Sequence, residues 1–271
     1  MQATRAVVLA RGAGSRMKRA DGEAGLDEAQ RRAADAGHKA MMPMGGRPFL
    51  DFVISSLADA GYTDVALIVA PDHDEIRRYY TQEAPPERVR LSFLVQQEPL
   101  GTANATLAIE PWAGNEPFIV LNADNLYPVD ALQSIGALDG PGLPVFERGD
   151  LIASSNIPAE RVAAFAIIEV DAIGCLARIV EKPGAEAAAA AGPHALISMN
   201  CWRFDSRIYS ACRDVERSPR GEFELPLAVG LAIERGVRFA AVPAQGPVLD
   251  LSSRSDVAEV ARRLAGVEVR P

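Results

Sequence analysis

Cysteine is scarce in this sequence of 271 residues, and its three cysteines form no closely spaced pair. Cys175, Cys201 and Cys212 therefore lack the arrangement of zinc and redox motifs, and their odd number is typical of reduced thiols in a cytoplasmic protein. Disulfides are not needed for stability, because 48% of the residues are hydrophobic and a chain of this length can bury a full core.

Long hydrophobic runs and an excess of basic residues are also absent. The first apolar run, residues 6–10, is too short for the core of a signal peptide, and no later run approaches the length of a membrane span. The formal net charge is -8, whereas nucleic acids and anionic membranes favour a basic protein surface. We therefore expect a soluble, cytoplasmic protein that binds neither nucleic acid nor a membrane.

Three known nucleotide-binding motifs are missing. No Gly-Lys-Ser/Thr sequence occurs, which excludes a P-loop nucleoside triphosphatase. Met17 stands where the third glycine of a dinucleotide-binding loop belongs, which disfavours an NAD-dependent dehydrogenase. His38, His73 and His194 lie too far apart for the His-x-Gly-His motif of one class of nucleotidyltransferases.

Short apolar runs alternate with helix-like stretches in the first half of the chain. The runs of strand length are residues 6–10, 65–70, 91–95, 118–121 and 165–170. This alternation predicts an α/β fold with a Rossmann-like, mixed but mainly parallel sheet and helices on both faces. A tight turn at residues 171–174 leads into another run at residues 176–180, which predicts an antiparallel hairpin. No linker rich in Pro, Gly or Ser divides residues 1–271, so we expect one domain.

Several helices are predicted with defined ends. Residues 49–60 place apolar side chains on one stripe, and Gly61 ends the helix. Asp72 followed by Glu75 resembles a capping box at the start of the next helix. Further helices are expected at residues 185–191, 223–234 and 255–264, with a strand at residues 237–242.

The connection between the first strand and the helix at residues 49–60 is unusually long, since such loops typically have about 2 to 6 residues. We interpret residues 19–38, approximately, as an inserted loop. Its middle, residues 26–36, is polar and rich in alanine, which predicts a short helix closed by Gly37. We expect a flap that orders over a bound triphosphate, and a tolerated surface insertion is the alternative.

Two glycines follow the first strand directly, at the sheet edge where backbone amides can wrap a phosphate. Gly12 and Gly14 lie in the sequence Leu-Ala-Arg-Gly-Ala-Gly-Ser-Arg-Met, and Lys39 follows later. The cations Arg16 and Lys39 thus bracket the glycine turn, which favours an anionic ligand. A tight turn with surface cations is the alternative.

This loop resembles the opening signature of the sugar-1-phosphate nucleotidyltransferase family, Leu-Ala-(Ala/Gly)-Gly-x-Gly-Thr-Arg-(Leu/Met), which a Lys-Pro pair follows. The residues that match are Leu9, Ala10, Gly12, Gly14, Ser15 in place of threonine, Arg16, Met17 and Lys39. Arg11 replaces a small residue, and Ala40 replaces the proline. The side chain of Arg11 either contacts phosphate or points to solvent, and the pattern leaves both open. The resemblance implies the fold of the nucleotide-diphospho-sugar transferases.

A second segment, Gln-Gln-Glu-Pro-Leu-Gly-Thr-Ala from Gln96 onward, follows the third strand and resembles the family's base-binding loop. The resemblance implies that Gln96 hydrogen-bonds the edge of the base and that Gly101 lets the base approach the backbone. Thr102 belongs to the same nucleotide-binding segment. An ordinary loop with a Pro-Leu-Gly turn is the alternative.

Two aspartates resemble the family's metal ligands. Asp124 ends the fourth strand in Asn-Ala-Asp-Asn, where the family has Gly-Asp-Asn, and Asp250 holds the position of a Trp-x-Asp-x-Gly-Thr segment. The resemblance implies that both bind Mg²⁺, a hard cation that prefers oxygen ligands and suits triphosphate chemistry. A helix cap is the alternative role for either aspartate.

Residues after the fifth strand resemble the family's sugar-phosphate site. The resemblance assigns Glu181 to sugar hydroxyls, Lys182 to the sugar phosphate, and Asn200 to the sugar. Ala166 stands where a glycine of the family commonly contacts the sugar through its backbone amide, so the resemblance places Ala166 in the same site. Trp202 also replaces a glycine, and the accepted sugar stays open. Trp202 either shapes the sugar pocket or packs in the core.

The resemblance implies transfer of a nucleotidyl group from a nucleoside triphosphate to a sugar 1-phosphate, with release of pyrophosphate. Arg16 and Lys39 would stabilise the leaving pyrophosphate, and Lys182 would hold the nucleophile. The alternatives are a nucleotide-sugar-binding regulatory protein without turnover, and transfer to a non-sugar phosphate such as phosphocholine. The sequence leaves the base, the sugar and the oligomeric state open.

Overall fold

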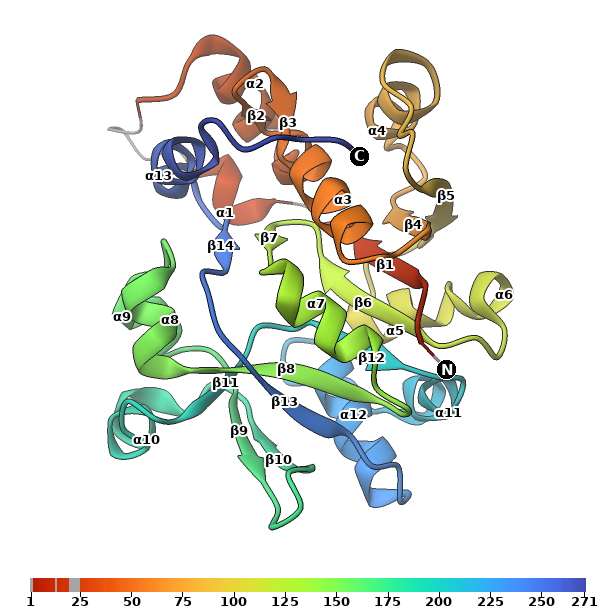
Figure 1. The fold of residues 1–271 in the computed structure, drawn as a ribbon, viewed down its shortest axis with the longest axis vertical. Helices are drawn as coiled ribbons and strands as arrows, with labels where there is room; N and C mark the ends of the chain where they lie inside the picture. Colours follow the sequence, from red (N-terminus) through yellow and green to blue (C-terminus); the bar gives the residue numbers. More distant parts are fainter. Residues whose placement is uncertain (1, 13, 20–24) are drawn as a thin grey trace.

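The computed structural model describes residues 2–12, 14–19 and 25–271, and a mixed sheet of ten strands runs through it (Figure 1). The strands are β1 (Arg5–Leu9), β4 (Asp64–Val69), β5 (Arg90–Val95), β6 (Phe118–Asn122), β8 (Gly142–Glu147), β9 (Ile167–Val170), β10 (Leu176–Val180), β11 (Leu196–Ser198), β12 (Trp202–Phe204) and β13 (Ala240–Ala244). Their order is β10-β9-β11-β8-β12-β6-β1-β4-β5, and β13 pairs with β8. β10, β11 and β12 run against the other strands, so the prediction of a mixed, mainly parallel sheet is confirmed.

Two short pairs of strands lie outside this sheet. β2 (Pro43–Met44) pairs with β3 (Arg47–Pro48), and β7 (Asn125–Leu126) pairs with β14 (Leu249–Asp250), both antiparallel. In the second pair Asp250 lies opposite Asn125. Two segments that are far apart in the sequence therefore meet just beyond the end of β6.

Helices cover both faces of the sheet (Figure 1). Successive strand residues point to opposite faces, so Ala6 and Val8 of β1 belong to one hydrophobic cluster and Val7 to the other. Helices that contribute to the first cluster include α3 (Phe49–Asp59), α7 (Val129–Gly136) and α13 (Arg254–Leu264). Those of the second are α5 (Thr102–Leu107), α6 (Glu110–Ala113), α11 (Arg207–Asp214) and α12 (Leu225–Glu234). The remaining helical segments are α1 (Ser15–Lys18), α2 (Glu28–Ala36), η1 (Lys39–Met41), α4 (Asp74–Arg78), η2 (Tyr79–Glu83), α8 (Arg148–Ser154), α9 (Ala159–Val162) and α10 (Gly184–Ala190).

Most predicted elements are confirmed within a few residues. The first four predicted runs are β1, β4, β5 and β6, and the predicted hairpin is β9 with β10. The helix expected in the insertion is α2, which Gly37 closes at its C-cap. Residues 20–24 of that insertion lie outside the described residues.

The capping box predicted at Asp72 and Glu75 is wrong. Helix α4 begins at Asp74 with His73 at its N-cap position, and no side chain caps it. Glu75 is engaged elsewhere, because its carboxylate lies 2.6 Å from Nδ1 of His38. A contact with the insertion therefore replaces the local cap.

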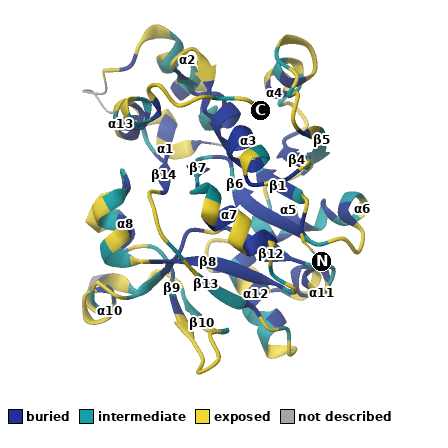
Figure 2. Ribbon diagram, in the orientation of Figure 1, coloured by how far each residue is buried: buried dark blue, intermediate teal, exposed yellow. Residues whose placement is uncertain are grey.

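Buried residues follow the central strands and the inner sides of the helices (Figure 2). Trp202 of β12 is 1% exposed and packs against Phe204 and Phe239, with ring centroids 6.1 and 6.4 Å away. Of the two roles left open for Trp202, the structure therefore shows packing in the core.

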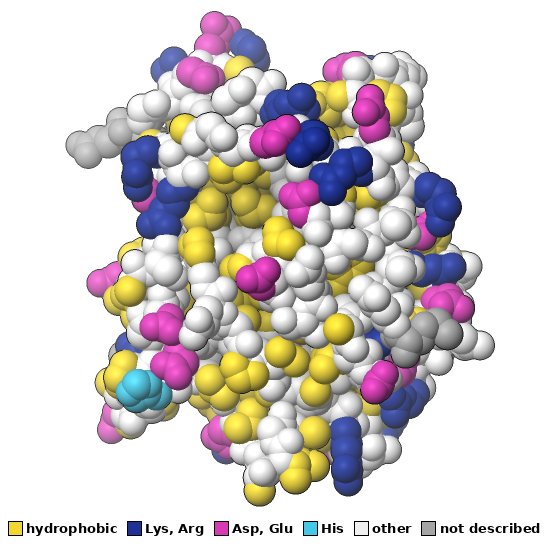
Figure 3. Space-filling view, viewed as in Figure 1, with side chains coloured by type: hydrophobic (Ala, Val, Ile, Leu, Met, Phe, Trp, Pro, Cys, Tyr) yellow, Lys and Arg dark blue, Asp and Glu magenta, His cyan; other side chains and the backbone are white. Residues whose placement is uncertain are grey.

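Charged side chains of both signs share the face shown in Figure 3, where Lys and Arg gather mainly in the upper half. Much of the lower half of this face is apolar or uncharged. Within the described ranges, no helix has both the length and the apolar character that a membrane crossing requires.

Gly101→Ala tests a close approach between two backbones. Gly101 has φ +109°, and a Cβ there would lie 2.5 Å from the carbonyl oxygen of Phe223. The substitution should lower the free energy of unfolding by about 2 to 5 kcal/mol, from backbone strain and overpacking together. Chemical denaturation measures this change.

Gly61→Ala is the matched control, because Gly61 has φ +93° but open space around its Cα. Backbone strain alone should cost about 1 to 2 kcal/mol there. Equal losses in the two variants would show that the contact with Phe223 contributes nothing.

Candidate functional site

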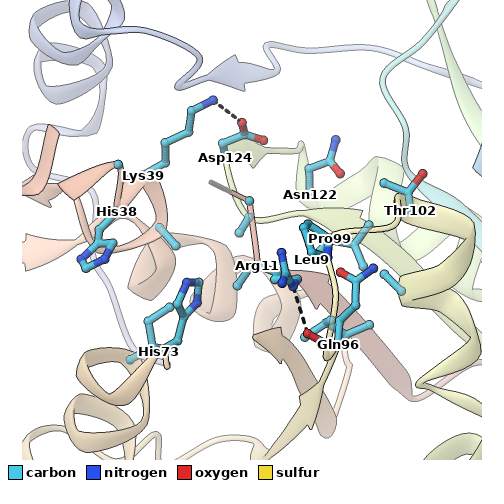
Figure 4. A pocket seen from close by; sticks show the side chains of 18 of the residues that line it. Leu9, Arg11, His38, Lys39, His73, Gln96, Pro99, Thr102, Asn122 and Asp124 are labelled. Carbon is cyan, nitrogen blue, oxygen red and sulfur yellow. Dashed lines mark hydrogen bonds and ion pairs between the residues drawn. The ribbon is translucent and has the colours of Figure 1, made fainter. Parts of the chain in front are cut away.

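A cavity of about 420 Å³ opens at the carboxyl ends of β1, β4 and β6 (Figure 4). The chain leaves β1 toward β4 on one side and later returns to β6 on the other. These strand ends therefore form a topological switch point, where open α/β sheets bind ligands. The predicted site residues that line the cavity are Leu9, Ala10, Gly12, Ser15, Lys39, Gln96, Gly101, Thr102 and Asp124.

The glycine loop is seated against the end of the inserted helix. Gly14 has φ +60°, and a Cβ there would lie 2.2 Å from the carbonyl oxygen of Gly37. Glycine is required for this approach, which places Gly12 and Ser15 at the cavity wall. Arg16 follows Ser15 in α1 and is exposed. The loop thus presents its backbone at one edge of the cavity, which suits an anion, whereas the predicted cation Arg16 is not among the residues that line it.

Two of the residues that line the cavity form an ion pair. Nζ of Lys39 donates to Oδ2 of Asp124 at 2.8 Å, and Figure 4 shows the two side chains meeting. Their side chains are only 16% and 27% exposed. The structure therefore brings together the cation that follows the insertion and the carboxylate that follows β6.

Gln96 is buried at the end of β5, and its amide is held on two sides. Nε2 donates to the carbonyl oxygen of Gly101 and to Oδ1 of Asn104, both at 2.9 Å. A carbonyl oxygen can only accept, so this contact fixes which end of the Gln96 amide is nitrogen. Oε1 is therefore the atom of this side chain left to recognise a ligand.

The other two residues of the predicted base segment support the wall of the cavity. The backbone of Phe223 occupies the space over the Cα of Gly101, so the close approach there is between two chain segments. The hydroxyl of Thr102 accepts from the backbone N–H of Leu225 at 2.8 Å. Both contacts tie the start of α5 to the segment before α12.

Arg11 does not simply point to solvent, and its contact with phosphate stays a prediction. Its Nε donates to the carbonyl oxygen of Gln96 at 2.9 Å, and its Nη2 donates to that of Gln97 at 3.3 Å. The side chain is half-buried and lines the cavity beside the predicted base reader.

Sequence reasoning missed two cavity residues, His38 and His73. Their rings lie 6.0 Å apart, and Nδ1 of His38 is paired with Glu75 at 2.6 Å. Burial lowers the pKa of His73, and the charges of His38 and Arg11 lower it further, while Asp72 opposes them. The position of His38 next to Lys39 was the one available signal.

Asp250 is buried in β14, and the side chains of three residues donate hydrogen bonds to its carboxylate. Oδ1 accepts from Nδ2 of Asn125 at 3.1 Å and from the hydroxyl of Ser252 at 3.0 Å, and Oδ2 accepts from Nη1 of Arg161 at 2.6 Å. Burial raises the pKa of Asp250, and nearby Asp124 adds to this, while Arg161 and Ser252 oppose it. The alternative of a simple helix cap is not what the structure shows, because Ser253 caps α13.

Arg161 is a second residue that the sequence did not reveal. Its guanidinium bridges Asp250 and Asp256, with contacts of 2.6 Å to each. The Asp256 carboxylate also accepts from the backbone N–H groups of Ser252 and Ser253. One arginine of α9 therefore neutralises two nearly buried carboxylates of the C-terminal segment.

The predicted sugar residues form a row beside the cavity. Asn200 lies two residues before Trp202, whose strand β12 pairs with β6, and β6 ends at Asn122, which lines the cavity. The register of β11, β9 and β10 places Ala166 beside Ser198, with Glu181 next along the row. The backbone N–H of Ser198 donates to the carbonyl oxygen of Ala166 at 3.0 Å.

Two residues of this row have strained backbones. Lys182 has φ +44° and Asn200 has φ +56°, the left-handed region that favours glycine. Such conformations cost about 1 to 3 kcal/mol for ordinary residues and cluster at functional sites. Partial burial raises the pKa of Glu181, the charge of Glu224 adds to this, and Lys182 opposes it.

Comparisons with known proteins agree with this geometry. A model of the family described as Nucleotidyl transferase matches residues 34–265. A low-salt glycan biosynthesis nucleotidyltransferase of Haloferax volcanii is 25% identical, covering 93% of this chain and 64% of its own length. A glucose-1-phosphate thymidylyltransferase of Streptomyces antibioticus is 25% identical, with 95% and 65% covered. The chain thus spans somewhat less than two thirds of these two relatives.

Other relatives match along nearly their full length. A UTP–glucose-1-phosphate uridylyltransferase of Haloferax volcanii is 24% identical, and 96% of each chain is covered. Among solved structures, a UDP-glucose pyrophosphorylase complexed with UDP-glucose has a TM-score of 0.76 at 18% identity, covering 98% of this chain and 100% of that one. A UTP-bound enzyme from Acinetobacter baumannii has a TM-score of 0.75 at 18% identity, with 98% and 95% covered. The structural matches confirm the predicted fold.

Arg161→Gln tests the shared cation of the C-terminal segment. The free energy of unfolding should fall by about 3 kcal/mol or more, because Asp250 and Asp256 stay nearly buried without their partner. Chemical denaturation at neutral pH measures the loss. Arg262→Gln is the matched control, since Arg262 also binds one carboxylate, Glu259, through two nitrogens but at the surface. The control should leave the midpoint unchanged, and an equal effect in both variants would contradict the buried role of Arg161.

Proposed function

The chain belongs to the nucleotidyl transferase family, and from this membership we propose that it joins a nucleoside triphosphate to a sugar 1-phosphate, releasing pyrophosphate and forming a nucleotide sugar. The observation that carries the proposal is the meeting of Lys39 and Asp124 at the switch point, beside the glycine loop. Two relatives are named for transfer to glucose 1-phosphate, with thymidylyl and uridylyl groups. The row of predicted sugar residues continues from this cavity along the sheet.

The proposed reaction is an in-line displacement at the α-phosphorus. An oxygen of the sugar phosphate forms the new bond to this phosphorus, and the bond to the β-phosphate oxygen breaks on the opposite side. The glycine loop, Arg16 and Lys39 stabilise the charge on the departing pyrophosphate, and Lys182 holds the sugar phosphate. No general base is required, because a phosphate monoester is already ionised near neutral pH.

Asp124 and Asp250 fit a Mg²⁺ ion with phosphate oxygens as its further ligands. A carboxylate offers about four acceptor positions, and the contacts of Asp250 with Asn125, Arg161 and Ser252 use three of them. Mg²⁺ is usually bound in proteins by one or two carboxylates together with phosphate oxygens of the substrate. When bound, the cation supplies neutralisation of phosphate charge.

The state of Gln96 indicates which bases are accepted. Both hydrogens of Nε2 are engaged with Gly101 and Asn104, so Oε1 is the reading group and needs a donor. Uracil, thymine and guanine carry a ring N–H on their pairing edge, whereas cytosine and adenine present an acceptor at the ring nitrogen and a donor only on the exocyclic amino group. If Oε1 accepts from the ring position, uridine, thymidine or guanosine triphosphates are the expected donors.

A substrate panel tests the proposal. Pyrophosphate release is measured with UTP, dTTP, GTP, CTP and ATP against glucose 1-phosphate, mannose 1-phosphate and phosphocholine, with Mg²⁺ and with chelator. We expect turnover with a hexose 1-phosphate, and CTP and ATP about tenfold or more less efficient. Turnover with phosphocholine alone would make the protein a different transferase. Binding of nucleotide sugars without turnover would make it a regulatory protein.

Asp250→Asn tests the two-carboxylate site. Loss of a metal ligand should reduce Mg²⁺-dependent turnover by about a hundredfold or more in a folded protein, as should Asp124→Asn. Asp256→Asn is the matched control, because Asp256 binds the same Arg161 and is equally buried. The control should lower the melting temperature and keep turnover in the folded state. Normal turnover and Mg²⁺ dependence in Asp250→Asn would leave Asp124 to act with another partner.

A further inference from the structure

Arg11 connects two parts of the cavity that are not neighbours in the sheet. It follows β1, whereas the carbonyl groups that it binds, those of Gln96 and Gln97, follow β5. β4 lies between these two strands. The side chain therefore spans the carboxyl end of β4, as the dashed contact between Arg11 and Gln96 in Figure 4 shows.

This span links the phosphate-facing loop to the group that recognises the base. Arg11 is the residue before Gly12, which lines the cavity, and it holds the main chain of Gln96 directly. Gln96 is also held from β4, since its backbone N–H donates to the carbonyl oxygen of Val69 at 3.1 Å. Its side chain is fixed by Gly101 and Asn104. Together these contacts fix the distance between the glycine loop and Oε1 of Gln96.

A fixed distance of this kind selects bases by length. A nucleotide bound here is anchored by its phosphates at the glycine loop and by its N–H edge at Gln96. In a purine one more ring separates the glycosidic nitrogen from that edge than in a pyrimidine. A purine therefore needs the base reader farther from the loop, and the two hydrogen bonds of Arg11 oppose that movement.

We propose that Arg11 is a specificity-determining residue that restricts this site to uridine and thymidine triphosphates and disfavours guanosine triphosphate. The inference rests on the proposed function for its substrate class, and it goes beyond Gln96, which accepts the N–H of all three bases. A shorter side chain at position 11 cannot reach across β4. The planar fork of arginine also has no equivalent in lysine, whose single nitrogen cannot donate to both carbonyls in the same way.

The test measures binding, so that it does not depend on turnover. Calorimetric titration with UTP, dTTP and GTP, each with Mg²⁺ and without sugar phosphate, gives the dissociation constants for the wild type, Arg11→Ala and Arg11→Lys. The wild type should bind UTP or dTTP at least about tenfold more tightly than GTP. Arg11→Ala should reduce this ratio by about tenfold, and Arg11→Lys by a similar amount, since two hydrogen bonds from a charged group are lost or distorted.

Arg77→Ala is the matched control. Nη2 of Arg77 also donates to a carbonyl at the end of β4, that of Ala70 at 3.4 Å, and its guanidinium lies over Phe93 outside the cavity lining. This variant should keep the wild-type ratio. A change of equal size in Arg77→Ala would show that the effect is a general loosening of the β4 end.

The outcomes separate this inference from the proposed function. If the wild type binds selectively and Arg11→Ala abolishes this selectivity, but no triphosphate releases pyrophosphate with any sugar phosphate, the result would support the role of Arg11 and overturn the transferase activity. Turnover with an unchanged ratio in Arg11→Ala would overturn the role of Arg11 alone. A wild type that prefers GTP, or that binds none of the three nucleotides, would also overturn it.

Discussion

The pairing of β14 with β7 is the constraint on which the site depends, because it holds two carboxylates close together beyond the end of β6. Asp124 contributes to the raised pKa of Asp250, second only to burial, so the two groups repel each other where water is scarce. The fold pairs the two carboxylates with different cations: Lys39 with Asp124, and Arg161, which also binds Asp256, with Asp250. These cations come from segments on either side of β6 in the sequence. The charge balance of the site therefore requires segments from both halves of the chain to be assembled.

Close contacts between distant segments hold the walls around this pair. Gly14 meets Gly37 at one wall, and Gly101 meets Phe223 at the other. Arg254, at the start of α13, donates to the carbonyl oxygen of Met17 at 2.8 Å and pairs with Asp35 of α2 at 2.5 Å. The described part of the insertion is thus docked onto the C-terminal helix. Its closure over a triphosphate stays a prediction. Any such movement must either break these contacts or move the C-terminal helix together with the insertion.

The parallel strands and nine of the cavity residues could be predicted from the sequence, because each strand is a continuous apolar run and the predicted residues follow at one sheet edge. β11 and β12 have only three residues each, too few to show a period. Arg161 could not be found, since its partners lie 89 and 95 positions away and no local pattern encodes them. The orientation of Arg11 depends on the separation of β1 and β5, which is a property of the assembled sheet.

The two ends of the proposed site are built differently. At the proposed base end, Gln96 is held by four hydrogen bonds from different segments. At the proposed sugar end, Lys182 keeps a left-handed backbone conformation that costs stability unless the surrounding structure maintains it, and Asn200 shares this conformation. Trp202 lies in the core. The remaining departure from the family pattern there is the methyl group of Ala166, a small change beside a buried strand, so we expect the sugar preference to depend on where these backbones lie.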